Sequence, residues 1–193
     1  MEKDLKWFVI RTPLGQEQKG MNYLSGKGIK TFTPIVTKIK KVDGVPTPVI
    51  AYRLPFLFFA QGTEQTLKPF VERNPDAPYL HFFCSYSGEV GKRRRQIITV
   101  PDVKMDSFIK ICETGNPDIR ICNEVIHKFA KGEYVRVTAG AFEGVQGRMV
   151  SIYGKKRVGI VIANTLTVMT SYIPDAFWEK VEEESQLTES PKY

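Results

Sequence analysis

The stretch from Gly132 to Ile162 constrains the fold more than any other part of the chain; it reads GEYVRVTAGAFEGVQGRMVSIYGKKRVGIVI. Apolar and polar residues alternate in its first, middle and last parts, which is the period-two pattern of half-buried strands. Glycines lie between these parts, where a chain that bends sharply or lets another backbone approach closely needs a residue without Cβ. A further alternating run extends from Leu166 to Tyr172. Four short strands with tight turns predict a small, strongly bent β-barrel.

These residues also resemble a known motif. The resemblance rests on Val135-Arg136-Val137, Gly140, Phe142, Gly144, Gly147 and the strand Lys155-Lys156-Arg157-Val158. They look like a KOW motif, the SH3-like barrel of ribosomal proteins and of NusG-type transcription factors. The resemblance implies that the barrel recruits a further factor, such as a ribosomal protein or Rho, through Phe142, Gly147, Arg148, Lys155 and Lys156. Packing and solubility would explain the same residues, so both interpretations stay open.

The chain before the barrel alternates predicted strands with predicted helices. The strands are expected at 6–12, 31–42, 47–60, 79–86 and 96–100, and the helices at 14–24, 63–73 and 101–113. Asp43-Gly44 is a strong hairpin turn, and Thr63 is the expected N-cap of the second helix. This order predicts helices packed on a mostly antiparallel sheet. The expected fold class is therefore α+β, with an α/β sandwich followed by the small barrel.

Turn residues and changes in composition place the expected domain boundaries. A first domain is expected over residues 1–113, and a linker over 114–131 that begins with Thr114-Gly115-Asn116-Pro117. The barrel, with a short C-terminal helix, is expected over 132–182, and a polar tail over 183–193.

The first domain resembles the N-terminal (NGN) domain of NusG proteins. The matching residues, in order, are Lys6-Trp7-Phe8-Val9, Gly28-Ile29, Phe32 to Pro34 and Leu54 to Phe58. The segments Ile98 to Pro101 and Tyr172 to Phe177 look most like the UpxY-type antiterminators, which are specialised NusG paralogues. Leu54-Pro55-Phe56 departs from the aromatic-Pro-Gly of housekeeping NusG proteins. The resemblance implies that the domain docks on the clamp helices of the largest RNA polymerase subunit through Phe8, Tyr52, Leu54 and Pro55.

Charge indicates the first domain as the part expected to meet phosphate, and a role in solubility is the alternative that charge alone leaves open. The whole chain has a net charge of +7, yet residues 132–193 carry seven Lys/Arg and eight Asp/Glu. The basic excess therefore lies in residues 1–131. Its densest run, Lys92, Arg93, Arg94 and Arg95, follows a Gly-containing loop and is a candidate for sequence-independent contact with nucleic acid. A solvated hairpin tip is the other interpretation.

No catalytic, metal or membrane signal is found. Neither His81 nor His127 has a nearby Cys or Ser that suggests an activated nucleophile, and the three cysteines are widely spaced. We therefore expect no catalytic residue, metal site or cofactor. No apolar run approaches the roughly twenty residues that span a bilayer. The N-terminus contains acidic residues and no long apolar core, so it is no secretory signal. The protein is expected to be a cytoplasmic monomer that makes no contact with membranes.

These features favour a non-enzymatic regulator of transcription elongation, in which the resemblance to antiterminators implies that pausing and termination are suppressed. An RNA-binding or ribosome-associated protein of the KOW class, without polymerase binding, is the alternative. The sequence leaves open which operon or recruiting element is involved, whether the effect is antitermination or pausing, and whether the barrel docks on the first domain.

Overall fold

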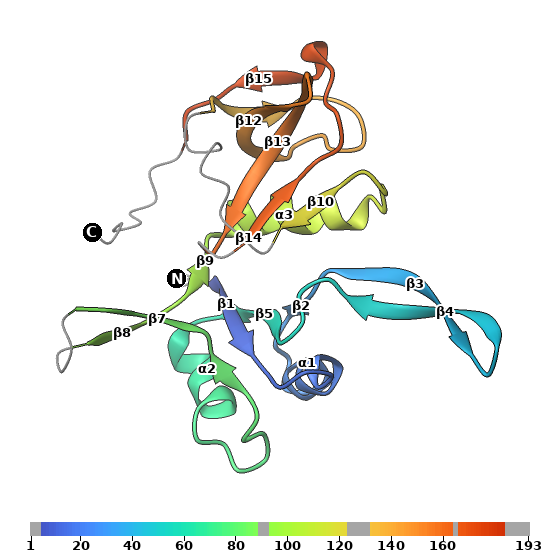
Figure 1. The fold of residues 1–193 in the computed structure, drawn as a ribbon. Coiled ribbons are helices and arrows are strands. Elements are labelled where there is room, and N and C mark those ends of the chain that lie inside the picture. The colour runs from blue at the N-terminus through green and yellow to red at the C-terminus, as the bar shows by residue number, and fades with distance from the viewer. Residues whose placement is uncertain (1–4, 89–92, 123–131, 164–165, 184–193) are drawn as a thin grey trace. The chain divides into compact units, whose positions relative to one another are not determined.

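The computed structural model describes residues 5–88, 93–122, 132–163 and 166–183. The chain divides into two units, Met1–Phe83 and Cys84–Tyr193, each with its own elements (Figure 1). The predicted α+β class is confirmed, because helices combine with mostly antiparallel sheet in this chain.

The first unit contains an antiparallel sheet with strand order β2-β5-β1-β6. The strands are β1 (Lys6–Arg11), β2 (Thr31–Phe32), β5 (Leu57–Gly62) and β6 (His81–Phe82). Strand β1 lies between β5 and β6, and its four middle residues are all buried. This explains why Trp7 to Ile10 is a continuous apolar run, since a strand covered on both faces does not alternate.

Two helices belong to this unit, α1 (Glu17–Ser25) and α2 (Glu64–Val71). The N-cap predicted at Thr63 is confirmed: Thr66 N donates to Thr63 Oγ1, and Thr63 N donates to Thr66 Oγ1, at 3.1 and 3.0 Å. In α1, a Cβ at Gly20 would lie 2.9 Å from side-chain atoms of Leu80 and Phe58. Gly20 therefore allows the helix to approach these core side chains closely.

A long two-stranded ribbon completes the first unit (Figure 1). It consists of β3 (Ile35–Val42) and β4 (Val45–Tyr52), joined at the predicted Asp43-Gly44 turn. Both turn residues have positive φ, 51° and 83°, as a type I′ turn requires. The two long strands predicted from the sequence are thus each broken, at residues 33–34 and 53–56, and the ribbon is a sheet of its own.

The second unit is built on an antiparallel sheet with strand order β10-β14-β13-β12-β11-β15. Its strands are β10 (Arg120–Cys122), β11 (Tyr134–Val137), β12 (Gln146–Ile152), β13 (Lys155–Ile162), β14 (Leu166–Met169) and β15 (Trp178–Lys180). The alternation predicted at Val135 and Val137 is confirmed, since both are buried while Arg136 between them is exposed. A hairpin of β7 (Cys84–Ser87) and β8 (Arg94–Ile97), the short strand β9 (Thr99–Val100) and helix α3 (Asp102–Glu113) precede this sheet.

Helix α3 packs on the strands of the second unit, whereas the sequence placed it in the first domain. Gln146 N donates to the hydroxyl of Ser107 on α3 at 3.0 Å, and α3 also contacts β13 and β14. The division after Phe83 therefore differs from the boundary expected at residue 113. Strand β10 lies within the expected linker, of which residues 123–131 are outside the described chain.

The short C-terminal helix expected before residue 182 is not formed. A 3-10 turn, η2 (Asp175–Phe177), leads instead into strand β15, which pairs with β11. The outer edge of β11 offers backbone hydrogen bonds that a helix would leave unmade, so the strand is favoured there. Residues 184–193 of the expected tail lie outside the described chain.

Candidate functional site

Two of the four residues expected to form an exposed patch on the first unit are core residues. Phe8 and Leu54 are only 4% and 3% exposed. Phe8 lies opposite Ala60 on the central strand, and its ring centroid is 5.5 Å from that of Phe82. The expectation that Phe8 and Leu54 lie on the surface is therefore wrong. Phe8 is packed in the middle of strand β1, and Leu54 is buried in the bend between β4 and β5.

The other two residues, Tyr52 and Pro55, reach the surface. Tyr52 is half-buried, and its hydroxyl donates to Gln18 Oε1 on α1 at 2.8 Å. Burial, and secondarily the nearby Glu17 carboxylate, raises the pKa of Tyr52 above its ordinary value. The hydroxyl therefore stays protonated and remains a hydrogen-bond donor at neutral pH. Pro55 is exposed at the start of the turn into β5.

Phe56, the residue after Pro55, is the most unusual residue of this turn, and it was not predicted from the sequence to be a binding residue. Its φ of 70° lies in the left-handed region, and its side chain is 45% exposed. Residues other than glycine rarely adopt this backbone conformation, because their Cβ makes it less favourable by about 1–2 kcal/mol. The signal was present in the sequence, since Phe56 occupies the position where the resembling family has glycine.

Hydrogen bonds on both sides of the Phe56 backbone hold this conformation. Phe56 N donates to the Glu17 carboxylate at 2.9 Å, and Thr12 N donates to Phe56 O at 2.9 Å. Glu17 is 1% exposed and begins helix α1, where the helix dipole stabilises a negative charge. The two hydrogen bonds come from segments far apart in the sequence and together fix the Phe56 backbone in the left-handed region. We define the docking corner as Tyr52, Pro55 and Phe56.

The basic run lies at the start of β8. Arg93, Arg94 and Arg95 are exposed, and Lys92 lies outside the described residues. The β7–β8 register sets Arg95 opposite Tyr86, which is 64% exposed and which the sequence reasoning did not select. Directly opposed residues share one face of the ribbon, so a ring and a cation are presented together. This combination suits both phosphate and an unstacked base.

In the second unit, four of the five residues expected to bind a partner are either packed in the interior or form contacts with other residues of the same unit. Phe142 is 4% exposed, and a Cβ on Gly147 would lie 2.6 Å from Gly159 O. Both therefore serve packing, and the expectation that Phe142 contacts a partner from the surface is wrong.

The three cations of that expected surface differ from one another. Arg148 donates to Gly132 O at 2.9 Å and pairs with Glu183. Lys156 Nζ lies 2.7 Å from Asp175 Oδ1 and 5.0 Å from the centroid of the Trp178 ring. Asp175 consequently has a pKa below its ordinary value, chiefly because Lys156 donates a hydrogen bond to it. Lys155 is exposed and makes none of these internal contacts in the described chain.

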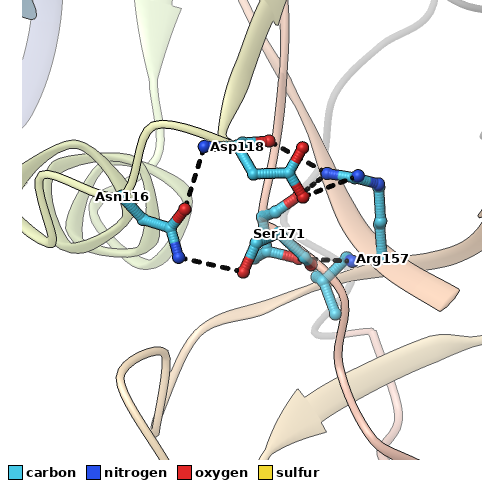
Figure 2. A network of polar contacts seen from close by, with 6 residues as sticks. Asn116, Asp118, Arg157 and Ser171 are labelled. Carbon is cyan, nitrogen blue, oxygen red and sulfur yellow. Dashed lines mark hydrogen bonds and ion pairs between the residues drawn. The ribbon is translucent and has the colours of Figure 1, made fainter. Parts of the chain in front are cut away.

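A polar network around Arg157 was not anticipated (Figure 2). Arg157 is only 4% exposed; its guanidinium donates to Asp118 O, Asp118 Oδ2 and Thr170 O at 3.0, 2.8 and 2.9 Å. Asn116 accepts from Asp118 N and donates to the Ser171 hydroxyl. The network fastens the segment between α3 and β10 to strands β13 and β14. It uses both terminal nitrogens of the buried Arg157 internally, so this arginine is a structural residue rather than a contact for phosphate.

Comparisons with known proteins find similarity only at a low level. The chain matches no family model and no curated protein. Among solved structures it is similar to Thermotoga maritima NusG, described for its domain interaction, at 20% identity over 93% of this chain and 98% of that chain, with a TM-score of 0.39. It is also similar to a chain of the MjSpt4:Spt5 complex, conformation A, at 14% identity over 92% of this chain and 99% of that chain, with a TM-score of 0.28. TM-scores this low carry neither fold nor function from those proteins to this chain.

The described residues form no cluster of side chains that could hold a metal ion. No group of three or more His, Cys, Asp or Glu side chains lies together there. His81 is exposed on β6, and His127 is outside the described chain. Among the described helices, none combines the length and the apolar composition needed to cross a membrane.

Proposed function

We propose that this protein is a non-enzymatic regulator of transcription elongation that binds RNA polymerase through the docking corner of its first unit. The single observation that carries the proposal is Phe56, an exposed aromatic side chain held in a left-handed conformation. A strained backbone that persists in an exposed turn is a reason to suspect function. The position coincides with the segment that, by the sequence resemblance, faces the clamp helices of the largest polymerase subunit.

The chemistry of the docking corner suits a pair of helices. An aromatic anchor that loses water on binding contributes more to affinity than the polar rim around it. Tyr52 adds a second ring whose hydroxyl is already satisfied by Gln18, so burying it in an interface leaves no donor unpaired. Phe8 and Leu54 act beneath this surface by packing the strand and turn that present it.

The β7–β8 ribbon supplies a second contact in the proposal. Arg93, Arg94 and Arg95, together with Tyr86, would meet the phosphates and bases of nucleic acid in the elongation complex. Binding to a closed, elongating polymerase in preference to other states would stabilise that state by the difference in affinity. We expect the bound protein to suppress pausing and termination, as the resemblance to the UpxY-type antiterminators implies. We also expect it to be a cytoplasmic monomer that serves a particular operon.

The barrel contributes less to the proposal than the sequence suggested. Lys155 is the member of the expected surface that stays exposed and outside the internal contacts described above. Recruitment of a ribosomal protein or Rho would then depend on Lys155 and the adjoining turn, which includes the 94% exposed Tyr153.

The second candidate is an RNA-binding or ribosome-associated protein of the KOW class. The exposed arginines and Tyr86 of the β7–β8 ribbon support this candidate as well as they support the elongation regulator, since they would also bind RNA in the absence of polymerase. This candidate gives no role to the docking corner, and that difference separates the two proposals.

The test is binding of the purified chain to core RNA polymerase. Phe56→Gly and Tyr52→Ala are expected to weaken binding by about tenfold each, the loss typical of an anchoring aromatic. Tyr153→Ala is the matched control, because it removes an exposed ring from the other unit and should leave affinity unchanged. Equal binding by folded Phe56→Gly and the unaltered chain would refute the docking corner, and association with ribosomal fractions alone would favour the second candidate.

A further inference from the structure

The β3–β4 ribbon has two edges that pair with no other strand in the described chain. In a hairpin with a two-residue turn, the residues that flank the turn form a hydrogen-bonded pair, and bonded and non-bonded pairs then alternate. Val42 and Val45 flank the turn here. The register continues to Pro34 and Arg53, where Arg53 N donates to Pro34 O at 2.9 Å, in agreement with this alternation.

The alternation determines which backbone groups point away from the ribbon. The non-bonded pairs are Ile35 with Tyr52, Thr37 with Ile50, Ile39 with Pro48, and Lys41 with Pro46. Their N–H and C=O groups face outward, toward the two open edges.

The two edges are not equivalent. On β4, the outward positions nearest the turn are Pro46 and Pro48, which have no N–H to offer. On β3, the four outward positions are Ile35, Thr37, Ile39 and Lys41, and each retains its N–H. Prolines thus protect β4 from strand pairing, while β3 keeps a full row of donors and acceptors.

The two faces of the ribbon also differ. Ile35, Ile39 and Ile50 share one face and are 55%, 69% and 69% exposed. Lys38 and Lys40 lie on the opposite face and are exposed, and neither forms an ion pair in the described chain. Near the turn, Lys41 shares the face of the isoleucines, and the exposed Val42 and Val45 share the face of Lys38 and Lys40. Away from the turn, an added strand would therefore meet isoleucines on one face and two ammonium groups on the other.

We propose that the outer edge of β3 binds an extended, acidic segment of a partner protein by strand addition. Backbone hydrogen bonds to the edge would give affinity, and alternate side chains would give specificity. Acidic residues would face Lys38 and Lys40, and aliphatic residues would face Ile35 and Ile39. The site lies along the edge of β3, and its Ile35 end adjoins the docking corner, because Ile35 is the cross-strand partner of Tyr52.

Charge argues against two other occupants. A second copy of this chain pairing through β3 would bring lysines of both copies together, which destabilises a strand pair. Nucleic acid would find phosphate partners in Lys38 and Lys40, but the cross-strand partners of these lysines are Val49 and Thr47, so no aromatic ring for base stacking lies directly opposite them. An acidic peptide uses both faces and the edge.

The test uses the full chain and a fluorescein-labelled peptide of eight alternating Glu and Val residues, followed by anisotropy. Thr37→Pro removes one outward N–H from β3 without removing a bond of the hairpin, and is expected to weaken binding by about tenfold. Ile50→Pro is the matched control, because Ile50 is the cross-strand partner of Thr37 and its N–H points to the other edge. It should change affinity by less than about twofold.

Charge is tested separately. Lys38→Glu with Lys40→Glu should abolish binding of the Glu-Val peptide and create binding of a Lys-Val peptide of the same length. Two forms of the Glu-Val peptide, N-methylated at every Glu or at every Val, serve as a test that needs no variant of the protein. Only one set of alternate N–H groups can face β3, so one form should bind and the other should fail.

Several results would overturn the proposal. They are equal losses for Thr37→Pro and Ile50→Pro, binding of both N-methylated peptides, and a preference of the lysines for single-stranded or duplex DNA over the Glu-Val peptide. A concentration-dependent dimer in ultracentrifugation that Thr37→Pro abolishes would assign the edge to a second copy instead.

Discussion

Phe56 allows the left-handed backbone to be tested apart from its exposed ring. Phe56→Gly and Phe56→Ala both remove the ring, and both retain the backbone bonds to Glu17 and Thr12. The two variants differ only in that alanine has a Cβ, which makes a φ of 70° less favourable. A Cβ there costs about 1–2 kcal/mol, whereas glycine loses about 0.5–1 kcal/mol more than alanine in conformational entropy on folding. The strain is the larger effect, so Phe56→Gly should be the more stable protein, by about 1 kcal/mol.

The assay is urea unfolding in a Trp178→Phe background, so that the buried Trp7 reports the first unit. For a slope of about 1–3 kcal/mol per molar, the Gly variant should unfold roughly 0.3–1 M urea later than the Ala variant. Gln65, exposed within helix α2, provides the control. There Gln65→Ala should be more stable than Gln65→Gly by about 1 kcal/mol, the opposite order. The same order at both positions would show that Phe56 is not held in the left-handed region.

Three further predictions concern the rest of the chain. Gly147→Ala should lower the stability of the second unit by about 1–3 kcal/mol in calorimetry, because its Cβ would meet Gly159 O at 2.6 Å; an unchanged transition would refute this close approach. Replacing Arg93–Arg95 with glutamine should reduce the slope of log affinity for DNA against log salt by roughly 1–3, and an unaltered slope would remove these residues from the interface. Since Lys156 lowers the Asp175 pKa, the carboxylate contributes stability above the ordinary pKa of about 3.9 and loses it as the pH falls through the folded value. NMR titration of Lys156→Met should then show the Asp175 pKa rising, and an unmoved pKa would contradict the assignment.

Local pattern was sufficient for most of the strands and helices. The alternation at Val135 and Val137, the Asp43-Gly44 turn and the Thr63 cap appear in the structure where the sequence placed them. Each depends on neighbours only a few residues away, through side-chain period, turn conformation or a capping hydrogen bond. Such signals survive without knowledge of the tertiary fold.

The surfaces were predicted less well, because exposure is decided by distant partners. Phe8 and Leu54 have the composition of an aromatic-aliphatic patch, but pairing with β5 and β6 places Phe8 in the core. The barrel residue Phe142 is buried for the same kind of reason. The local sequence pattern does not determine which strand will cover a given aromatic side chain.

The sequence by itself determined an α+β chain with a basic first part, a glycine-rich second part and a long hairpin, since these follow from period, charge and turn chemistry. Only the tertiary structure decided that Phe56 is exposed, because Glu17 and Thr12 hold its backbone from other segments. It also decided that α3 belongs with the later strands, through Ser107 and the packing of its apolar face. Contacts between residues far apart in the chain select one conformation from several that local preferences allow, and the candidate site is made of such contacts.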